Sequence, residues 1–309
     1  MFVVKGVILA LVLVGILVLF IRAPWLAREP FQNIKKKHAI LGSISGKKVI
    51  LVGGSGVANG LSAGVIQAHL PGYEAVNMGL NAGLGVEFNL REIMEAIKPG
   101  DIILLSPEYD NFEGGCRGSV QLLKAINVAP FAARYLDGER YQELLRNDVL
   151  TFLQLKAQSY LDGFAGMMTG IGEVAIDGKG DRISRSALRD VGSLEFSFRL
   201  LPQPYGECAK ILRRFHEQCK EKGAVAVLSF PALPAPQYER ARREIELLSE
   251  KLQMDTGMLI LHPPAATVYE SGLFDDTVYH LGRQGRELRS LMIARLLKEK
   301  VLHRGEGRQ

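Results

Sequence analysis

Short apolar runs alternate with amphipathic segments along most of the chain. Lys48–Val52 reads Lys-Val-Ile-Leu-Val and ends at a pair of glycines, and Asp101–Ser106 reads Asp-Ile-Ile-Leu-Leu-Ser. Continuous apolar runs of this length are typical of parallel strands that are buried on both faces. Three further runs are strand candidates by the same criterion: Tyr73–Met78, Ala224–Ser229 and Gly257–Leu261.

Between these runs, apolar residues recur at the spacing of an amphipathic helix. The predicted helices are Leu61–Leu70, Phe88–Ile97, Tyr205–Lys222, Tyr238–Met254 and Gln284–Lys298. In the last of them we expect one face to point to the core and a face with Arg283, Arg286 and Arg289 to point to the solvent. The expected core-facing residues are Leu288, Leu291, Met292 and Leu296. The alternation predicts a three-layer α/β domain, with a flavodoxin-like parallel sheet of about five strands and helices on both faces.

The middle of the chain does not continue this alternation. Val120–Ala129 and Arg140–Ser159 have helical spacing, whereas Gly170–Gly192 is rich in glycine and charge and is expected to be a loop. We therefore predict an insertion at about 107–203 within a domain that spans 47–300. Such an insertion is expected to act as a lid or as a partner surface.

The N-terminal segment predicts a transmembrane anchor. Phe2–Ile21 is apolar except for Lys5, and a helix needs about 20 such residues to cross a bilayer. No small-residue cleavage site follows, and Trp25 lies where an interface tryptophan is expected, which favours an uncleaved anchor over a signal peptide. The predicted division is an anchor at 1–22, a linker at 23–46 and a tail at 301–309.

The net charge of +5 is concentrated in short basic clusters. Lys35–Lys37 is predicted to form a juxtamembrane patch that faces anionic lipid. Aromatic residues do not interleave with the basic clusters and no nucleic-acid-binding motif is present, so we expect no nucleic-acid partner.

The three cysteines do not indicate a metal site. Cys116, Cys208 and Cys219 form no Cys-x-x-Cys pair and have no ligand spacing with the six histidines. We therefore predict no metal and no diffusible cofactor. One disulfide is compatible with an oxidising compartment, although the sequence does not require it.

Polar and glycine-rich loops follow several predicted strands. Sites in an open parallel sheet form at the carboxyl ends of the strands. Ser55 follows the first strand within Gly-Gly-Ser-Gly, and His280 lies beyond the last strand, shortly after Asp275 and Asp276. A serine nucleophile needs a base and a third group that orients the base, and these residues supply both types. His262, which ends a strand, is the second histidine candidate.

The Gly-Gly-Ser-Gly turn has a second interpretation. By itself it is more typical of a helix N-cap than of a nucleophile. The histidine in the expected order is what favours a nucleophile at Ser55.

Four blocks of the chain resemble the ordered blocks of the SGNH (GDSL-like) hydrolase superfamily. They are Val-Gly-Gly-Ser55-Gly, Asn77-Met-Gly79-Leu-Asn81, Ser106-Pro-Glu-Tyr and Asp276-Thr-Val-Tyr-His280-Leu. The resemblance is strongest to membrane-anchored bacterial members associated with acylation of envelope polysaccharide or teichoic acid. It implies that Ser55 is the nucleophile, His280 the base and Asp276 the group that orients the base. It also implies that the amides of Ser55 and Gly79 bind the oxyanion.

Two positions depart from the family pattern. Asp276 lies four residues before His280 where the family places its aspartate three before, so Asp275 stays an alternative. Glu108 stands where the family has an oxyanion-binding asparagine, and an ionised carboxylate accepts hydrogen bonds but donates none. Asn81 and Asn111 are then the alternative side-chain donors.

The resemblance implies a membrane-anchored serine esterase or O-acyltransferase that acts on acyl groups of a cell-envelope glycan or its precursor. The expected location is the bacterial inner membrane, with one span and an extracytoplasmic catalytic domain. The basic residues after the span favour the cytoplasm by the positive-inside rule, so the predicted side rests on the resemblance. The alternative is a catalytically inactive SGNH-like protein that binds a polymer or docks a membrane acyltransferase.

Overall fold

The computed structural model of the chain describes residues 2–25, 30–169, 175–183 and 191–302. The chain forms two compact units. The first joins 1–32 with 120–174, and the second joins 33–119 with 175–309. The predicted insertion at about 107–203 overlaps the later segment of the first unit, and much of the predicted loop Gly170–Gly192 lies outside the described residues.

The second unit is built on a five-stranded parallel sheet, which confirms the predicted fold class. The strand order is β2-β1-β3-β4-β6. This is the flavodoxin-like order, in which the first strand lies between the second and the third. The strands are β1 (Lys48–Gly53), β2 (Glu74–Asn77), β3 (Ile102–Ser106), β4 (Val225–Leu228) and β6 (Leu259–Ile260). A separate two-stranded sheet pairs β5 (Leu233–Pro234) with β7 (Val268–Tyr269).

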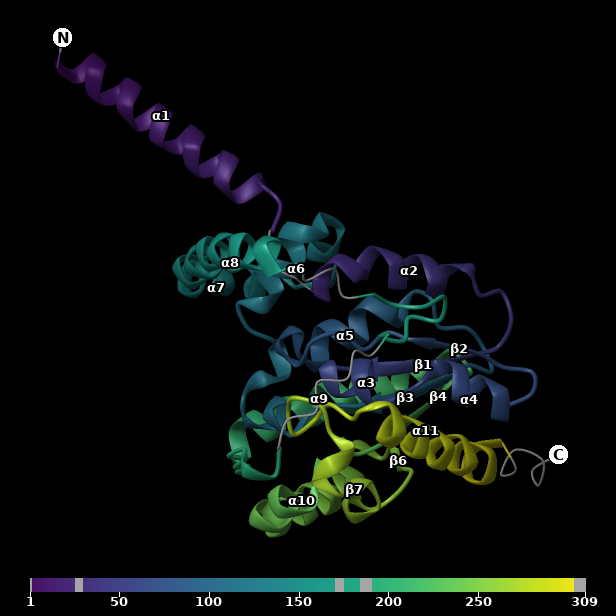
Figure 1. The fold of residues 1–309 in the computed structure, drawn as a ribbon. Coiled ribbons are helices and arrows are strands. Elements are labelled where there is room, and N and C mark those ends of the chain that lie inside the picture. Colours follow the sequence, from purple (N-terminus) through teal and green to yellow (C-terminus); the bar gives the residue numbers. More distant parts are fainter. Residues whose placement is uncertain (1, 26–29, 170–174, 184–190, 303–309) are drawn as a thin grey trace. The chain divides into compact units, whose positions relative to one another are not determined.

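Helices cover both faces of the sheet, because successive strand residues point to opposite sides. In β1, Val49 and Leu51 pack with α4 and α11, whereas Ile50 and Val52 pack with α5, α9 and α10. Figure 1 shows this layering around β1 and β3. The helices of this unit are α2 (Ile34–Ser43), α3 (Ser55–Gly60), α4 (Ala63–His69), α5 (Gly85–Met94), α9 (Pro202–Glu221), α10 (Ala235–Thr256) and α11 (Arg283–Leu297).

The last helix lies where the sequence predicts it, but it buries a different face. Leu288 is 46% exposed and Leu291 is 36% exposed, whereas Arg289 is fully buried. The prediction is therefore wrong for Leu288, Leu291 and Arg289, whereas Met292 packs against the core as predicted. The buried positions are Gly285, Arg289, Ser290, Ile293, Ala294 and Leu297.

Arg289 joins the ends of three strands. Its Nη2 atom donates hydrogen bonds to Ser106 Oγ at 2.8 Å, at the end of β3, and to Phe230 O at 2.9 Å, just after β4. Its Nη1 atom donates to Gly56 O at 3.3 Å, in the helix that follows β1. Burial lowers the pKa of Arg289 to about 10, so the guanidinium is still charged at neutral pH. These bonds explain why α11 turns an arginine toward the sheet.

One of the predicted lipid-facing lysines is also buried. Lys37 is 3% exposed, and its Nζ donates to Asn77 O and Gly180 O, both at 2.7 Å. Burial lowers its pKa to about 8. The prediction of a lipid-facing position is therefore wrong for Lys37, which instead braces the end of β2.

The first unit contains α1 (Phe2–Arg22), α6 (Gln121–Val128), α7 (Gly138–Asn147) and α8 (Val149–Thr169). The sequence predicts one helix over Arg140–Ser159, but the chain there forms α7 and α8, which are separated at Asp148. Residues Val3–Arg22 form a helix that is long and apolar enough to cross a membrane, a test that a signal sequence also passes.

The end of α1 is held by a polar clasp. Lys156 Nζ donates to Ile21 O at 2.9 Å and to Ala23 O at 2.7 Å, and Asn127 Nδ2 donates to Ile21 O at 2.8 Å. Trp25 donates through Nε1 to Asn127 Oδ1. A helix leaves its last carbonyl groups without partners inside the helix, and these side chains supply partners for them.

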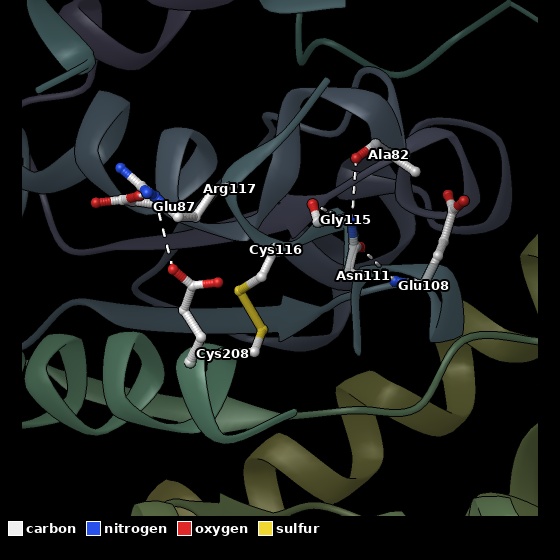
Figure 2. The surroundings of a disulfide bond; sticks show 9 residues. Ala82, Glu87, Glu108, Asn111, Gly115, Cys116, Arg117 and Cys208 are labelled. Carbon is white, nitrogen blue, oxygen red and sulfur yellow. Dashed lines mark hydrogen bonds and ion pairs between the residues drawn. A yellow bond between two sulfur atoms is a disulfide. The ribbon is translucent and has the colours of Figure 1, made fainter. Parts of the chain in front are cut away.

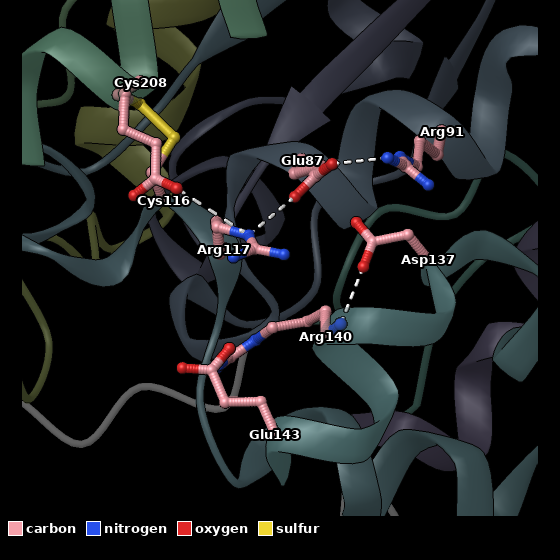
Figure 3. A network of polar contacts seen from close by, with 9 residues as sticks. Glu87, Arg91, Cys116, Arg117, Asp137, Arg140, Glu143 and Cys208 are labelled. Atoms are coloured by element: carbon pink, nitrogen blue, oxygen red, sulfur yellow. Dashed lines mark hydrogen bonds and ion pairs between the residues drawn. A yellow bond between two sulfur atoms is a disulfide. The ribbon is translucent and has the colours of Figure 1, made fainter.

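A disulfide links Cys116 to Cys208, across 92 residues of sequence (Figure 2). It connects the short 3-10 turn Gly115–Arg117 to α9. Next to it, Arg117 lies 3.4 Å from Glu87 and 3.8 Å from Glu207, and Glu87 also pairs with Arg91 (Figure 3). Cys219 is a free thiol that is buried in the core.

We expect Arg289→Met to lower the free energy of unfolding by about 3 kcal/mol or more, because it leaves several buried acceptors without a donor. Chemical denaturation of the variant measures this loss. Arg295→Met, on the exposed side of the same helix, is the control and should show no comparable loss. Equal stability of wild type and Arg289→Met would contradict the bracing role.

Reduction of the disulfide should lower the free energy of unfolding by roughly 4 kcal/mol, because the link closes a long loop in the unfolded chain. Urea denaturation with and without reductant tests this. A thiol titration in denaturant should find one reactive cysteine before reduction and three after it. Three thiols before reduction would show that the bond does not form.

Candidate active site

The loop after β1 and the loop before α11 meet in the second unit, although they lie more than 200 residues apart in the sequence. Ser55 begins α3 directly after β1. A Cβ atom on Gly56 would lie 3.5 Å from Tyr279 Cβ, and one on Gly60 would lie 3.8 Å from Tyr279 O. The segment that carries His280 therefore packs against the helix that carries Ser55.

Ser55 donates its hydroxyl hydrogen bond to Glu108. The distance from Ser55 Oγ to Glu108 Oε1 is 3.2 Å, and the amide of Gly56 donates to the same oxygen at 2.6 Å. The Glu108 residue is only 3% exposed. Glu108 follows β3, which lies beside β1 in the sheet, so the parallel strands deliver both residues to one edge.

Asn111 fixes the main chain at Glu108 (Figure 2). Its Oδ1 atom accepts from the Glu108 amide at 3.1 Å, and its Nδ2 atom donates to Ala82 O at 3.1 Å and to Gly115 O at 3.3 Å. Both amide hydrogens of Asn111 are thus directed at carbonyl groups of neighbouring loops. Asn111, which the sequence offered as an oxyanion donor, therefore holds the loop after β3 in place.

Asp276 lies against the imidazole of His280. The distance from His280 Nδ1 to Asp276 Oδ1 is 2.7 Å. This hydrogen bond is the first cause that holds the pKa of Asp276 below its usual range, and the charges of His280 and Arg182 add to the effect. An Nδ1–H that donates to a carboxylate leaves Nε2 as the acceptor of the neutral ring.

Asp275, the alternative candidate for orienting the His280 ring, makes different contacts from Asp276. Its backbone amide donates to His280 O at 2.8 Å, and a Cβ atom on Gly282 would lie 2.8 Å from Asp275 Oδ1. Of the two candidates for orienting the ring, the structure brings Asp276 to His280 Nδ1.

Ser55 and His280 are not hydrogen-bonded to one another in the part of the chain that the structure describes. His280 lies within electrostatic reach of Glu108, because the charge of His280 lowers the pKa of that carboxyl. The site thus contains two pairs: Ser55 with Glu108, and His280 with Asp276.

Gly79 and Asn81, the candidate oxyanion-binding residues after β2, already make other hydrogen bonds. The amide of Gly79 donates to Asn77 Oδ1 at 2.9 Å, and Asn77 Nδ2 points at carbonyls of the α3 segment. Asn81 accepts from the Gly83 amide through Oδ1 at 2.8 Å. In this arrangement the Gly79 amide already has an acceptor, so binding an oxyanion there would require Asn77 to release it.

The second histidine candidate belongs to another pair. His262 is 4% exposed, and its Nε2 lies 2.8 Å from Ser229 Oγ. Its Nδ1 lies 3.0 Å from Pro263 O. Burial lowers the pKa of His262 to about 4, so the ring is neutral at physiological pH. It joins the ends of β4 and β6 inside the core.

Sequence reasoning missed the segment 175–183 as part of the site region. Asp181, which is 5% exposed, accepts hydrogen bonds from the Ala63 amide at 2.8 Å and from Asn77 Nδ2 at 3.1 Å. Arg182 donates to Asn59 Oδ1 at 2.9 Å, and Asn59 Nδ2 donates to Ser55 O at 2.8 Å. The sequence signal is the turn pattern Asp-Gly-Lys-Gly, which predicts a bend but not its position.

Within the described ranges, no group of three or more His, Cys, Asp or Glu side chains is arranged to hold a metal ion. The Ser55–Glu108 and His280–Asp276 pairs together contain a hydroxyl, two carboxylates and an imidazole, and the Gly56 amide adds a backbone donor. Groups of these types can carry out nucleophilic attack and proton transfer on an acyl ester.

No protein-family model matches the chain, and no curated protein sequence matches it. Seven chains of solved structures match it. One is protein YxiM from Bacillus subtilis, with 13% sequence identity and a TM-score of 0.39. The match covers 85% of this chain and 58% of that one, so this chain spans little more than half of that protein's length. A likeness this distant leaves the activity to be argued from the site.

Replacing His280 by alanine should raise the pKa of Asp276 toward its ordinary value of about 3.9, because the main hydrogen bond to the carboxylate is lost. A carbon-13 NMR titration of the carboxyl group measures the change. In wild type this bond adds stability above about pH 4, and the stability is lost as the pH falls through the lower folded pKa. Identical midpoints in the two proteins would contradict the pairing.

Proposed function

We propose that the protein is a membrane-anchored serine esterase or O-acyltransferase that acts on acyl groups of a cell-envelope glycan or its precursor. The observation that carries the proposal is the polar cluster at the end of β1 and β3. There the Ser55 hydroxyl is bonded to a buried carboxylate, and the charge of His280, whose ring is held by Asp276, acts on that carboxylate.

In this proposal Ser55 attacks the acyl carbon and forms an ester with it. His280 handles the protons of the departing and incoming alcohols, and Asp276 orients the ring through Nδ1. Transfer to water makes the protein an esterase, and transfer to a sugar hydroxyl makes it an acyltransferase. The resemblance of four sequence blocks to SGNH hydrolases supports this reaction class.

The proposed location is the bacterial inner membrane, with α1 as a single span and the catalytic unit on the extracytoplasmic side. Two observations support it. The apolar helix is long enough to span, and the Cys116–Cys208 disulfide is typical of an oxidising compartment. The disulfide favours the extracytoplasmic side over the cytoplasmic side that the basic residues suggest. The proposed partners are therefore the membrane and an acyl-carrying glycan.

A second candidate is a catalytically inactive protein of the same fold that binds an envelope polymer or docks a membrane acyltransferase. One specific observation favours it. Glu108 stands where the family has an oxyanion-binding asparagine, and its carboxylate oxygen accepts a hydrogen bond from the Gly56 amide, next to Ser55. If that carboxylate never leaves or gains a proton, the site cannot stabilise a tetrahedral intermediate.

A fluorophosphonate probe should label Ser55 in the full-length protein. We expect Ser55→Ala to abolish labelling and His280→Ala to slow it by about 100-fold or more, because a positioned acid–base group contributes that much. Gel fluorescence and mass spectrometry of the labelled peptide give the readout.

The matched control is Ser229→Ala, which removes the hydroxyl of the buried Ser229–His262 pair and should leave labelling unchanged. Circular dichroism verifies that each variant is folded. A folded wild-type protein that does not react would favour the binding protein over the enzyme.

A further inference from the structure

We propose that Glu108 is a catalytic residue that takes the hydroxyl proton of Ser55, while His280 serves the departing and incoming alcohols. This inference rests on the proposed function, because it concerns the same nucleophile. It assigns a role to the one carboxylate that the family pattern would replace by asparagine.

The first argument is the geometry around Glu108 Oε1. This atom is the acceptor of the Ser55 hydroxyl, and the Gly56 amide directs a second hydrogen bond at it. A general base must lie within hydrogen-bond reach of the proton that it removes, and Glu108 meets this condition at 3.2 Å. Within the described residues, His280 does not.

The second argument is that the backbone is shaped to admit this carboxylate. A Cβ atom on Gly54 would lie 2.6 Å from Ala82 N and 2.7 Å from Glu108 Oε1, and one on Gly56 would lie 3.2 Å from the same carboxylate oxygen. The two distances at position 54 are too short for real atoms, so a side chain there would have to displace the Ala82 main chain as well as the carboxylate. Gly-Gly-Ser-Gly thus provides room for Glu108 as well as the turn into α3.

The third argument is that the Glu108 carboxylate forms no ion pair within the described part of the chain. Arg289 lies close enough to affect the electrostatics, but its guanidinium donates to Gly56 O, Ser106 Oγ and Phe230 O. The carboxylate therefore keeps its basicity. Its main chain is held by Asn111, so the side chain starts from a fixed point.

The groups around Glu108 shift its pKa in both directions. Burial raises its pKa, and the charge of Asp110 raises it further. The Gly56 amide, the charge of His280 and the Ser55 hydroxyl lower it. Tyr279 also faces Glu108, and its own pKa is raised by burial, so it stays neutral. Burial is the largest of these effects and makes Glu108 a stronger base than an exposed carboxylate.

The proton balance of the acylation step is as follows. Ser55 Oγ forms a bond to the acyl carbon, its proton moves to Glu108 Oε1, and the carbonyl electron pair moves to the carbonyl oxygen. The intermediate then collapses, the carbon–oxygen bond to the alcohol breaks, and protonated His280 gives its Nε2 proton to that alcohol. Glu108 and His280 are both neutral at the end of the step.

Deacylation reverses these transfers. Water or a sugar hydroxyl loses its proton to His280 as it attacks the acyl carbon, and Ser55 regains its proton from Glu108 as it leaves. While it holds the proton, Glu108 is an O–H donor and no longer repels an oxyanion. A neutral carboxyl group thus supplies the donor that asparagine supplies in the family pattern.

The test measures the rate of Ser55 labelling by a fluorophosphonate from pH 5 to 9 in the full-length protein. We expect Glu108→Gln to slow labelling about 100-fold, because glutamine keeps the shape but cannot take a proton. Glu92→Gln, which changes another buried carboxylate on α5, is the matched control and should label at the wild-type rate. In wild type the rate should fall as the pH drops through the raised pKa of Glu108, since the protonated acid accepts no proton.

A second variant separates catalysis from structure. Glu108→Ala should also label slowly, and added formate should restore its labelling by tenfold or more, because formate can take the vacated place as a base. A slow Glu108→Ala that formate does not restore would reduce Glu108 to a structural residue. Labelling of Glu108→Gln at or above the wild-type rate would overturn the inference and identify the carboxylate as an obstruction.

These outcomes are distinct from failure of the proposed function. If wild type labels at Ser55 but Glu108→Gln is not slowed, the esterase or acyltransferase proposal stands and only the role of Glu108 falls. If folded wild type does not label at all, the proposed function falls and this inference falls with it.

Discussion

The buried guanidinium of Arg289 is the interaction on which the arrangement of the candidate site depends. Main-chain and side-chain acceptors at the ends of β1, β3 and β4 all point at one cation from α11. Burial of a charge is costly unless its donors are satisfied, so this cation restricts where three loops can lie. Gly56 and Ser106 are two of its partners, and they flank Ser55 and Glu108 along the chain. Arg289 therefore restricts the position of Ser55 relative to Glu108 by binding groups next to them in the chain.

The local electrostatics around Ser55 differ from those of a serine beside a histidine alone. The acceptor of its hydroxyl hydrogen bond is a buried carboxylate, and the charge of the His280 imidazole acts on that carboxylate. A carboxylate in this place opposes the negative charge of a tetrahedral intermediate for as long as it is ionised. In the proposed reaction, the same carboxylate loses its charge, and with it that opposition, once it has gained the hydroxyl proton of Ser55. Whether the site is active or inert therefore depends on the protonation of a single buried side chain.

The sequence predicted the parts of the structure that depend on local patterns. The apolar run Lys48–Val52 could be assigned to a buried strand because both faces of a parallel strand are apolar. The orientation of α11 could not be predicted, since leucine spacing suggests one buried face whereas hydrogen bonds to Arg289 impose another. The Ser55–Glu108 hydrogen bond could not be predicted either. It joins the ends of two neighbouring strands, and its distance depends on the pairing of β1 with β3. The hairpin around Asp181 reaches the site region through contacts with residues more than 100 positions away, which no periodicity encodes.

The polar clasp at the end of α1 acts through the main chain of the helix. Lys156 and Asn127 bind carbonyl oxygens of residues 21 and 23 and make no use of the side chains there. Every amino acid presents the same carbonyl group, so these bonds are indifferent to which apolar residues occupy positions 21 and 23, whereas the side chain of Phe20 stacks on Tyr160. Exchanges of one apolar residue for another at those two positions would accumulate at little cost during evolution, whereas mutations that remove Lys156 would not. The end of the helix can thus drift in sequence while its attachment is preserved.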